Sequence, residues 1–148
     1  MIATSARRVT SQTDQAINQE IRRKTEMRLG YYAGHRDEIG RRLDELDEEW
    51  DVERVLETGS SALSLTGLVL SVARGRKWLL LPVVVQGFFM QHALQGWCPP
   101  LPVLRRLGFR TQYEIERERY ALKALRGDFK DVERAEQGVG RAMEAVRA

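Results

Sequence analysis

The sequence predicts an all-α protein in which a two-helix transmembrane hairpin is flanked by cytoplasmic amphipathic helices. The stretch from Trp78 to Leu104 contains no Asp, Glu, Lys or Arg, although 30% of the 148 residues are charged. Its roughly 27 residues exceed the roughly 20 that a helix needs to cross a bilayer. A second uncharged stretch, Thr58 to Ala73, precedes it, and both flanks carry apolar residues at helical spacing among many charges.

The first region, residues 1–57, is predicted to form amphipathic helices. Between Asp37 and Glu57, four apolar residues follow at steps of four, three and four, which is the spacing of a helix-packing seam. These residues are Ile39, Leu43, Leu46 and Trp50. We expect the seam to pack on the carboxyl-terminal helices or on a second copy of the chain. The charged residues between them are expected on a solvated face, and no metal site is predicted because no Glu-x-x-His spacing occurs.

The second region, residues 58–104, is predicted to be the membrane hairpin with a proline-rich interfacial end. Its first arm, Thr58 to Ala73, would be about 24 Å long as a helix. Small residues recur along it at helical intervals and would let a partner helix approach closely. They are Ser60, Ser64, Gly67 and Ser71. The turn is expected at residues 74–77, with Gly75 as its flexible residue.

The second arm is predicted to run from Trp78 to Trp97. A helix between these residues would place the two indoles about 28 Å apart, close to the hydrocarbon thickness of a bilayer, so both are expected to be interface anchors. Prolines end the helix after Trp97. In the following stretch, apolar residues are expected to rest on the membrane while Arg105 and Arg106 meet anionic headgroups.

Polar residues form a predicted intramembrane face on the second arm. Gln91, Gln95 and Cys98 share one side with Gly87, and His92 stands beside them. The amides are expected to bond to the first-arm serines or to another copy of the chain. Alternatively, the face is a path or site for a polar ligand or proton, with His92 as the titrating group. Metal binding by His92 is not predicted because no other ligand has suitable spacing.

Cys98 is the only cysteine, so no internal disulfide is possible. One interpretation is a small, weakly apolar residue at the membrane edge. The other is a reactive thiol, which needs access and a lowered pKa, supplied by Arg105 and Arg106 if the proline segment folds back.

The third region, residues 105–148, is predicted to be helical and cytoplasmic. Thr111 to Glu114 has the pattern of a capping box, so a helix should begin there and stop at Gly127. A last helix is expected to be capped by Asp128. Its apolar residues would be Phe129, Val132, Val139, Met143 and Val146.

Composition and motifs argue against several classes of function. The 24 basic residues are interleaved with 21 acidic ones, so nucleic-acid binding is not expected. The sequence has no Ser-His-Asp constellation, metal box or nucleotide motif, and therefore neither catalysis nor a cofactor is predicted. The amino terminus is not a secretory signal because no apolar core follows Arg8. Basic residues on both sides of the hairpin favour cytoplasmic termini.

Three stretches carry a family resemblance. Gly96-Trp97-Cys98-Pro99, placed after a short apolar hairpin, resembles the YgaP-like transmembrane domain family of small bacterial inner-membrane proteins. The stretches from Leu46 to Arg54 and from Glu116 to Phe129 are similar to a branch of that family. The resemblance implies a bacterial inner-membrane location. Some members carry a rhodanese sulfurtransferase domain before the hairpin, but no cysteine precedes Thr58 here, so that domain is not expected.

The sequence thus predicts a structural or interaction module, a scaffold or anchor without catalysis of its own. Its expected partners are the lipid bilayer and either a second copy or another membrane protein. The alternative is a thiol or persulfide relay protein that uses Cys98. A third interpretation is a soluble helical protein with a buried hairpin.

Overall fold

The computed structural model describes residues 4, 6–130 and 138–147, and within them all regular secondary structure is helical. The predicted all-α fold is therefore confirmed, whereas the membrane-spanning hairpin stays a prediction. In chain order the helices are α1 (Arg8–Ser11), α2 (Gln15–Gly34), η1 (Arg36–Glu38), α3 (Ile39–Glu48), α4 (Val52–Arg74), η2 (Arg76–Leu79), α5 (Leu80–Gln95), α6 (Leu101–Arg106), α7 (Gln112–Arg126) and α8 (Gly138–Arg147).

The chain forms two compact units, each built from segments that are distant in sequence. Unit 1 combines Met1–Ile21 with Trp50–Tyr113, and unit 2 combines Arg22–Glu49 with Glu114–Ala148. The units are therefore not consecutive stretches of the chain, and each is described separately below.

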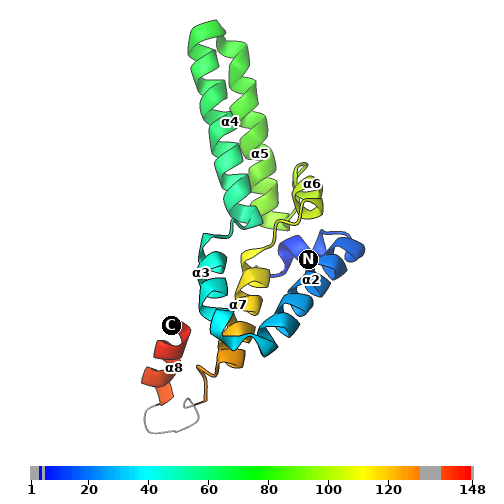
Figure 1. The fold of residues 1–148 in the computed structure, drawn as a ribbon. Helices are drawn as coiled ribbons and strands as arrows, with labels where there is room; N and C mark the ends of the chain where they lie inside the picture. The colour runs from blue at the N-terminus through cyan, green and yellow to red at the C-terminus, as the bar shows by residue number, and fades with distance from the viewer. Residues whose placement is uncertain (1–3, 5, 131–137, 148) are drawn as a thin grey trace. The chain divides into compact units, whose positions relative to one another are not determined.

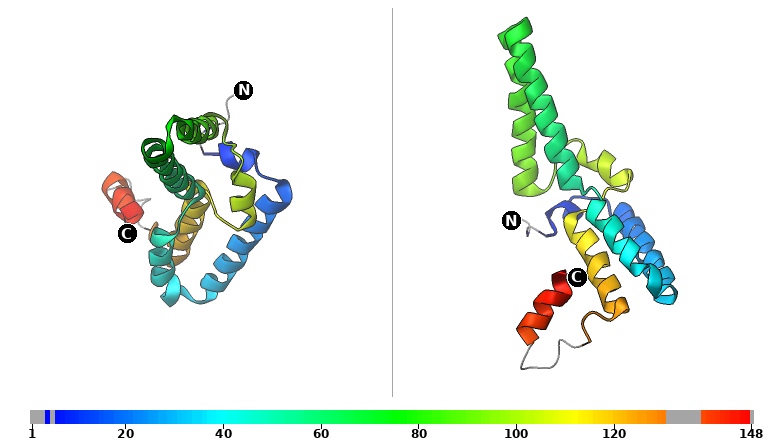
Figure 2. Two further views of the ribbon diagram at one scale, coloured as in Figure 1. Left: turned by 90° about the horizontal axis from the view of Figure 1, so that it is seen from above. Right: turned by 60° about the vertical axis from the view of Figure 1, so that its left-hand side comes forward.

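In unit 1, α4 and α5 lie side by side and are joined by Gly75 and η2 (Figures 1 and 2). Gly75 has a φ of 109°, a conformation that glycine adopts without steric cost. At the other end of the pair, a small apolar cluster gathers residues from three parts of the chain. Its buried members are Val9, Val52, Leu56, Cys98 and Leu101.

The helix predicted from Asp37 to Glu57 is interrupted, which corrects the sequence-based boundary. Residue Glu49 is extended, with a ψ of 125°, and α4 starts anew at Val52. The Asp51 carboxylate accepts a hydrogen bond from the Arg54 amide at 2.6 Å, which caps the new helix. The Val52 amide donates to the Arg110 carbonyl at 2.8 Å, so a contact distant in sequence stabilises the break.

Unit 2 contains the predicted helix seam, with one correction. Three of its residues, Ile39, Leu43 and Leu46, are buried in an apolar cluster that α7 completes with Ile115 and Leu122. The seam thus packs on a carboxyl-terminal helix of the same chain. Trp50 does not belong to it: the residue is 43% exposed because the helix has already ended, and Arg54 stacks on its ring at 4.5 Å.

The end of the chain differs from the prediction as well. As expected, α7 begins directly after Thr111, but Asp128 and Phe129 lie in a turn, and the described part of the last helix is α8. The Asp128 carboxylate pairs with the Arg126 guanidinium, with contacts of 2.8 and 2.6 Å, instead of capping a helix. Val132 lies outside the described residues.

Candidate functional site

The α4–α5 pair carries a large apolar surface that the described residues of unit 1 leave exposed. More than half of the Val69 side chain is exposed, and Val72 is 90% exposed. Soluble monomers rarely expose contiguous apolar surface of this kind. The exposed apolar residues of the pair are Leu63, Leu65, Leu68, Val69 and Val72 on α4, and Leu79, Leu80, Val83, Val84, Phe88, Met90 and Leu94 on η2 and α5.

One helical run within the described residues is long and apolar enough to cross a membrane, judged by length and composition. It lies within Arg36–Arg74, a range that the break before Val52 divides, and its apolar part belongs to α4 because α3 is densely charged. Only 11% of its apolar window is buried, whereas the core helix of a soluble protein is mostly buried. The 16 residues of α5 are fewer than the roughly 20 of a typical span, and η2 adds four more.

Where α4 meets α5, the Gly67 backbone lies close to α5. A Cβ atom on Gly67 would lie 2.5 Å from Cδ of Pro82 and 3.2 Å from Cβ of Leu81. The other residues of the predicted small face, Ser60, Ser64 and Ser71, are half-buried along the same helix. Pro82 lies in the first turn of α5, where its missing amide costs no helical hydrogen bond.

The polar contacts between α4 and α5 differ from those expected. Gln86, which the sequence did not single out, donates from Nε2 to the Ser64 hydroxyl at 2.8 Å. The Ser60 and Ser71 hydroxyls donate to carbonyls three residues earlier in α4. Their bonds therefore stay within one helix, and neither joins the second arm.

One residue of the predicted polar face, Cys98, does not lie on α5 with the others. The helix ends at Gln95, where the left-handed Gly96, with a φ of 77°, turns the chain. Gln91 is half-buried and Gln95 is exposed, whereas Cys98 lies beyond the helix in the apolar cluster. The prediction that Cys98 continues the face of Gln91 and Gln95 is wrong because it assumed an unbroken helix.

His92 and Cys98 meet inside unit 1. The Cys98 sulfur lies 3.5 Å from Nδ1 of His92, and the two residues are 3% and 2% exposed respectively. Burial raises the pKa of the Cys98 thiol, and a backbone hydrogen bond with Leu101 opposes this shift only in part. The thiol donates to Nδ1 when the imidazole proton is on Nε2, and the sulfur accepts from Nδ1 in the other tautomer. This shift is opposite in direction to the one that a reactive thiol needs.

The amino-terminal segment closes this site, a role that the sequence analysis missed. Val9 is 2% exposed in the same cluster as Cys98. A Cβ atom on Gly96 would overlap the Arg8 backbone, so only glycine permits this approach. A short segment of mixed polar residues gave no periodicity from which its docking could be inferred.

Arg105 does not face lipid headgroups as predicted. The residue is 1% exposed, and its guanidinium donates to the Thr13 hydroxyl at 3.2 Å and to the Asn18 side chain at 3.0 Å. It also donates to the Phe109 carbonyl at 2.9 Å. Buried charged groups require such partners, and here the amino-terminal segment supplies them. Arg106 is exposed.

The predicted interface anchors are both half-buried. Trp97 packs against the apolar cluster that contains Cys98. Trp78 belongs to η2, beside the exposed basic residues Arg74, Arg76 and Lys77.

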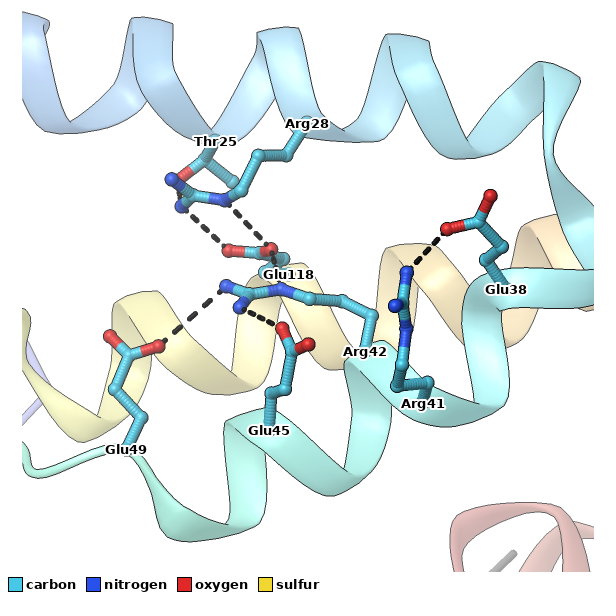
Figure 3. A network of polar contacts seen from close by, with 8 residues as sticks. All are labelled: Thr25, Arg28, Glu38, Arg41, Arg42, Glu45, Glu49 and Glu118. Carbon is cyan, nitrogen blue, oxygen red and sulfur yellow. Dashed lines mark hydrogen bonds and ion pairs between the residues drawn. The ribbon is translucent and has the colours of Figure 1, made fainter.

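A second polar site, in unit 2, was not predicted at all (Figure 3). Glu118 of α7 is fully buried, and its carboxylate accepts bonds from Arg28 of α2 at 3.0 and 2.8 Å. It also accepts from Nε of Arg42 of α3 at 3.0 Å. Arg42 in turn pairs with Glu45 at 2.9 Å and Glu49 at 3.7 Å. One carboxylate thus joins three helices. Of these residues, Arg42, Glu45 and Glu49 belong to the face that was expected to be solvated.

Within the described residues, no group of three or more His, Cys, Asp or Glu side chains is placed to hold a metal ion. Comparison of the sequence with protein families, with characterised proteins and with solved structures finds no match to any of them.

Proposed function

We propose that this chain is a membrane-anchored structural or interaction protein of the bacterial inner membrane, with no catalysis of its own. In this proposal α4 and α5 cross the bilayer as a hairpin related to the YgaP-like domain, and both termini are cytoplasmic. The observation that carries it is the exposed apolar surface of the α4–α5 pair, whose α4 window is only 11% buried. Burial of such a surface in lipid removes it from water at a gain of roughly 25 cal/mol per Å².

The dimensions of the pair support this proposal. The 23 residues of α4 give a helix of about 34 Å, and the 20 residues of η2 and α5 together give about 32 Å. Both lengths are slightly greater than the roughly 30 Å of a hydrocarbon core. The basic residues at the tip, Arg74, Arg76 and Lys77, are exposed and would reach headgroups or water on the far side.

In this proposal, unit 2 presents a binding surface to a partner and does not catalyse a reaction. Its apolar cluster and the Glu118 network fix the relative positions of α2, α3 and α7 by contacts that are buried and satisfied. Such a network can hold the three helices in one arrangement. In this role the unit presents a constant surface to a partner at the membrane.

Extraction of membranes with alkaline carbonate tests the anchor. The full chain should stay in the pellet and be released by detergent, whereas a soluble helical protein or a peripheral one would be washed off. A matched pair of variants sharpens the test: Val69→Arg on α4 and Met27→Arg on α2 both change residues that are more than half exposed. Only Val69→Arg should reduce retention, since only Val69 is proposed to face lipid.

Orientation requires a separate measurement. At the carboxyl terminus, a reporter protein that functions only in the cytoplasm should be active. A reporter that functions only outside the cytoplasm should be inactive at the same position. The opposite pattern would refute cytoplasmic termini while leaving the hairpin itself in place.

One observation favours the alternative function, a thiol or persulfide relay. His92 lies within hydrogen-bond reach of the Cys98 sulfur, the arrangement of an activated thiol. Burial of both residues and the raised pKa of Cys98 favour a structural pair instead. Replacement of Cys98 by Ser separates the two functions: a scaffold keeps its assembly and phenotype, and a relay loses the phenotype while remaining assembled.

A further inference from the structure

Trp50 and Arg54 form an exposed pair at the open end of the α4–α5 pair, the end that lies away from the Gly75 turn. The Arg54 guanidinium stacks on the Trp50 ring at 4.5 Å, and both side chains are exposed. Helix α4 begins at Val52, so Arg54 lies in its first turn. The uncharged stretch starts at Thr58, four residues or about 6 Å further along the helix. The pair therefore lies just outside the apolar part of α4.

Stacking on Trp50 leaves the hydrogen-bond donors of Arg54 available. The donors of a guanidinium lie in its plane, whereas the aromatic ring covers its face. Within the described residues Arg54 forms no ion pair, and the exposed carboxylate of Glu57, three residues later, does not pair with it. In unit 2, by contrast, Arg28, Arg42 and Arg119 all pair with carboxylates.

Helix α6 adds a second exposed group at the same end (Figure 1). Leu101 is buried in one apolar cluster with Val52, and α6 contacts α4, so α6 lies level with the start of α4. On the outer side of this segment, Val103 is 56% exposed and Leu107 is 70% exposed. Arg106 is exposed between them in sequence, and it forms no ion pair with any described residue.

This combination of side chains suits the headgroup layer of a membrane. Tryptophan is enriched at the boundary between membrane and water, and apolar side chains beside arginines are typical of segments that lie in that boundary. A guanidinium can bind a phosphate through two parallel N–H···O bonds. With the hydrocarbon core beginning near Thr58, a headgroup layer roughly 5–8 Å thick includes Arg54.

We propose that the open end of the α4–α5 pair binds anionic phospholipids of the cytoplasmic leaflet. Arg54 and Arg106 each bind a lipid phosphate, while the exposed apolar side chains around them lie among the headgroups. Lipid is the occupant because this surface continues directly from the apolar surface of α4 and α5. The inference rests on the proposed membrane location and goes beyond it, since a hairpin can cross a bilayer without preferring one lipid.

The lipids that stay bound during purification test this proposal. The full chain is reconstituted in vesicles of equal parts phosphatidylglycerol and phosphatidylcholine and then purified in mild detergent, and its bound lipids are quantified. The wild type should be enriched in phosphatidylglycerol. Arg54→Gln and Arg106→Gln should each lower this enrichment about fivefold. Arg36→Gln is the matched control, because Arg36 is also exposed but belongs to η1 in unit 2.

Two results would overturn the proposal. One is a wild type without enrichment in phosphatidylglycerol, and the other is an equal loss in Arg36→Gln, because net charge alone would then explain the effect. Trp50→Leu removes the ring on which Arg54 stacks and should lower the enrichment about two- to fivefold; no change would refute the role of Trp50. Carbonate extraction separates the failures: a chain that is released refutes the anchor, and a retained chain without lipid preference refutes only the lipid site.

Discussion

Glu118 gives the sharpest test of how unit 2 is stabilised. Replacement by Gln keeps the shape of the side chain but removes its charge and turns one acceptor oxygen into a donor NH₂ group. The bonds that the carboxylate accepts include two from Arg28, at 3.0 and 2.8 Å, and one from Arg42 at 3.0 Å. At least one guanidinium N–H would then face another donor inside the protein.

The cost follows from burial. Removing one partner of a buried ion pair costs about 3–5 kcal/mol. Here the lower end applies, because the Arg28 side chain is 33% exposed and Arg42 keeps its contact with Glu45. We expect Glu118→Gln to destabilise unit 2 by about 3 kcal/mol, which corresponds to roughly a hundredfold in its opening equilibrium.

Hydrogen exchange of the full chain in detergent micelles measures this change. Amides of α2, α3 and α7 within unit 2 should exchange about a hundredfold faster, and those of α4 and α5 at an unchanged rate. Glu45→Gln is the matched control, since Glu45 also pairs with Arg42 but its side chain is 49% exposed. Its effect should stay below about 1 kcal/mol. If the two variants exchange alike, the buried carboxylate does not stabilise unit 2 as argued.

Three other predictions concern unit 1. Gly67→Ala should lower the melting temperature because the new Cβ atom would clash with Pro82. Gly59→Ala, in open space on the same helix, is the control and should be neutral or stabilising by roughly 0.5–1 kcal/mol. A similar melting temperature for the two variants would contradict the close contact at Gly67. At pH 7, Cys98 should be alkylated far more slowly in the folded protein than in denaturant, because burial restricts access to the thiol and raises its pKa. Equal alkylation rates would support the hypothesis that Cys98 is a reactive thiol. Glu53→Gln should stabilise the protein at pH 7, because it removes the charge of a carboxylate whose buried oxygen lacks a hydrogen-bond partner among the described residues. Melting curves at pH 7 measure the gain, and an unchanged or lower melting temperature would refute this cause.

Much of the helical content could be predicted because its signals are local. The spacing of Ile39, Leu43 and Leu46 identified a buried helix face, and the pattern after Thr111 located the start of α7. The break before Val52 could not be predicted in this way. It depends on the Arg110 carbonyl, which is distant in sequence, and the apolar spacing continues through Trp50 as if the helix were unbroken.

The candidate sites show the same division. The apolar surface of α4 and α5 could be predicted, because both helices come from stretches of sequence without charged residues. The position predicted for Cys98 was wrong because the chain turns at Gly96. The turn brings the thiol into contact with His92 and into the apolar cluster of Val9. A change of direction at one glycine alters every contact after it, and periodicity does not report it.

By itself, the sequence determined the all-helical class, the apolar character of the central helices and the position of the basic turn, because each depends on the order of neighbouring residues. The tertiary structure decided which charges are buried. Glu118 and Arg105 resemble the solvated residues around them in sequence, yet both are buried. Their partners, Arg28 and Arg42 for the first and Thr13 and Asn18 for the second, come from distant segments. A charge can be buried only where folding supplies such partners, so its burial follows from the folded chain.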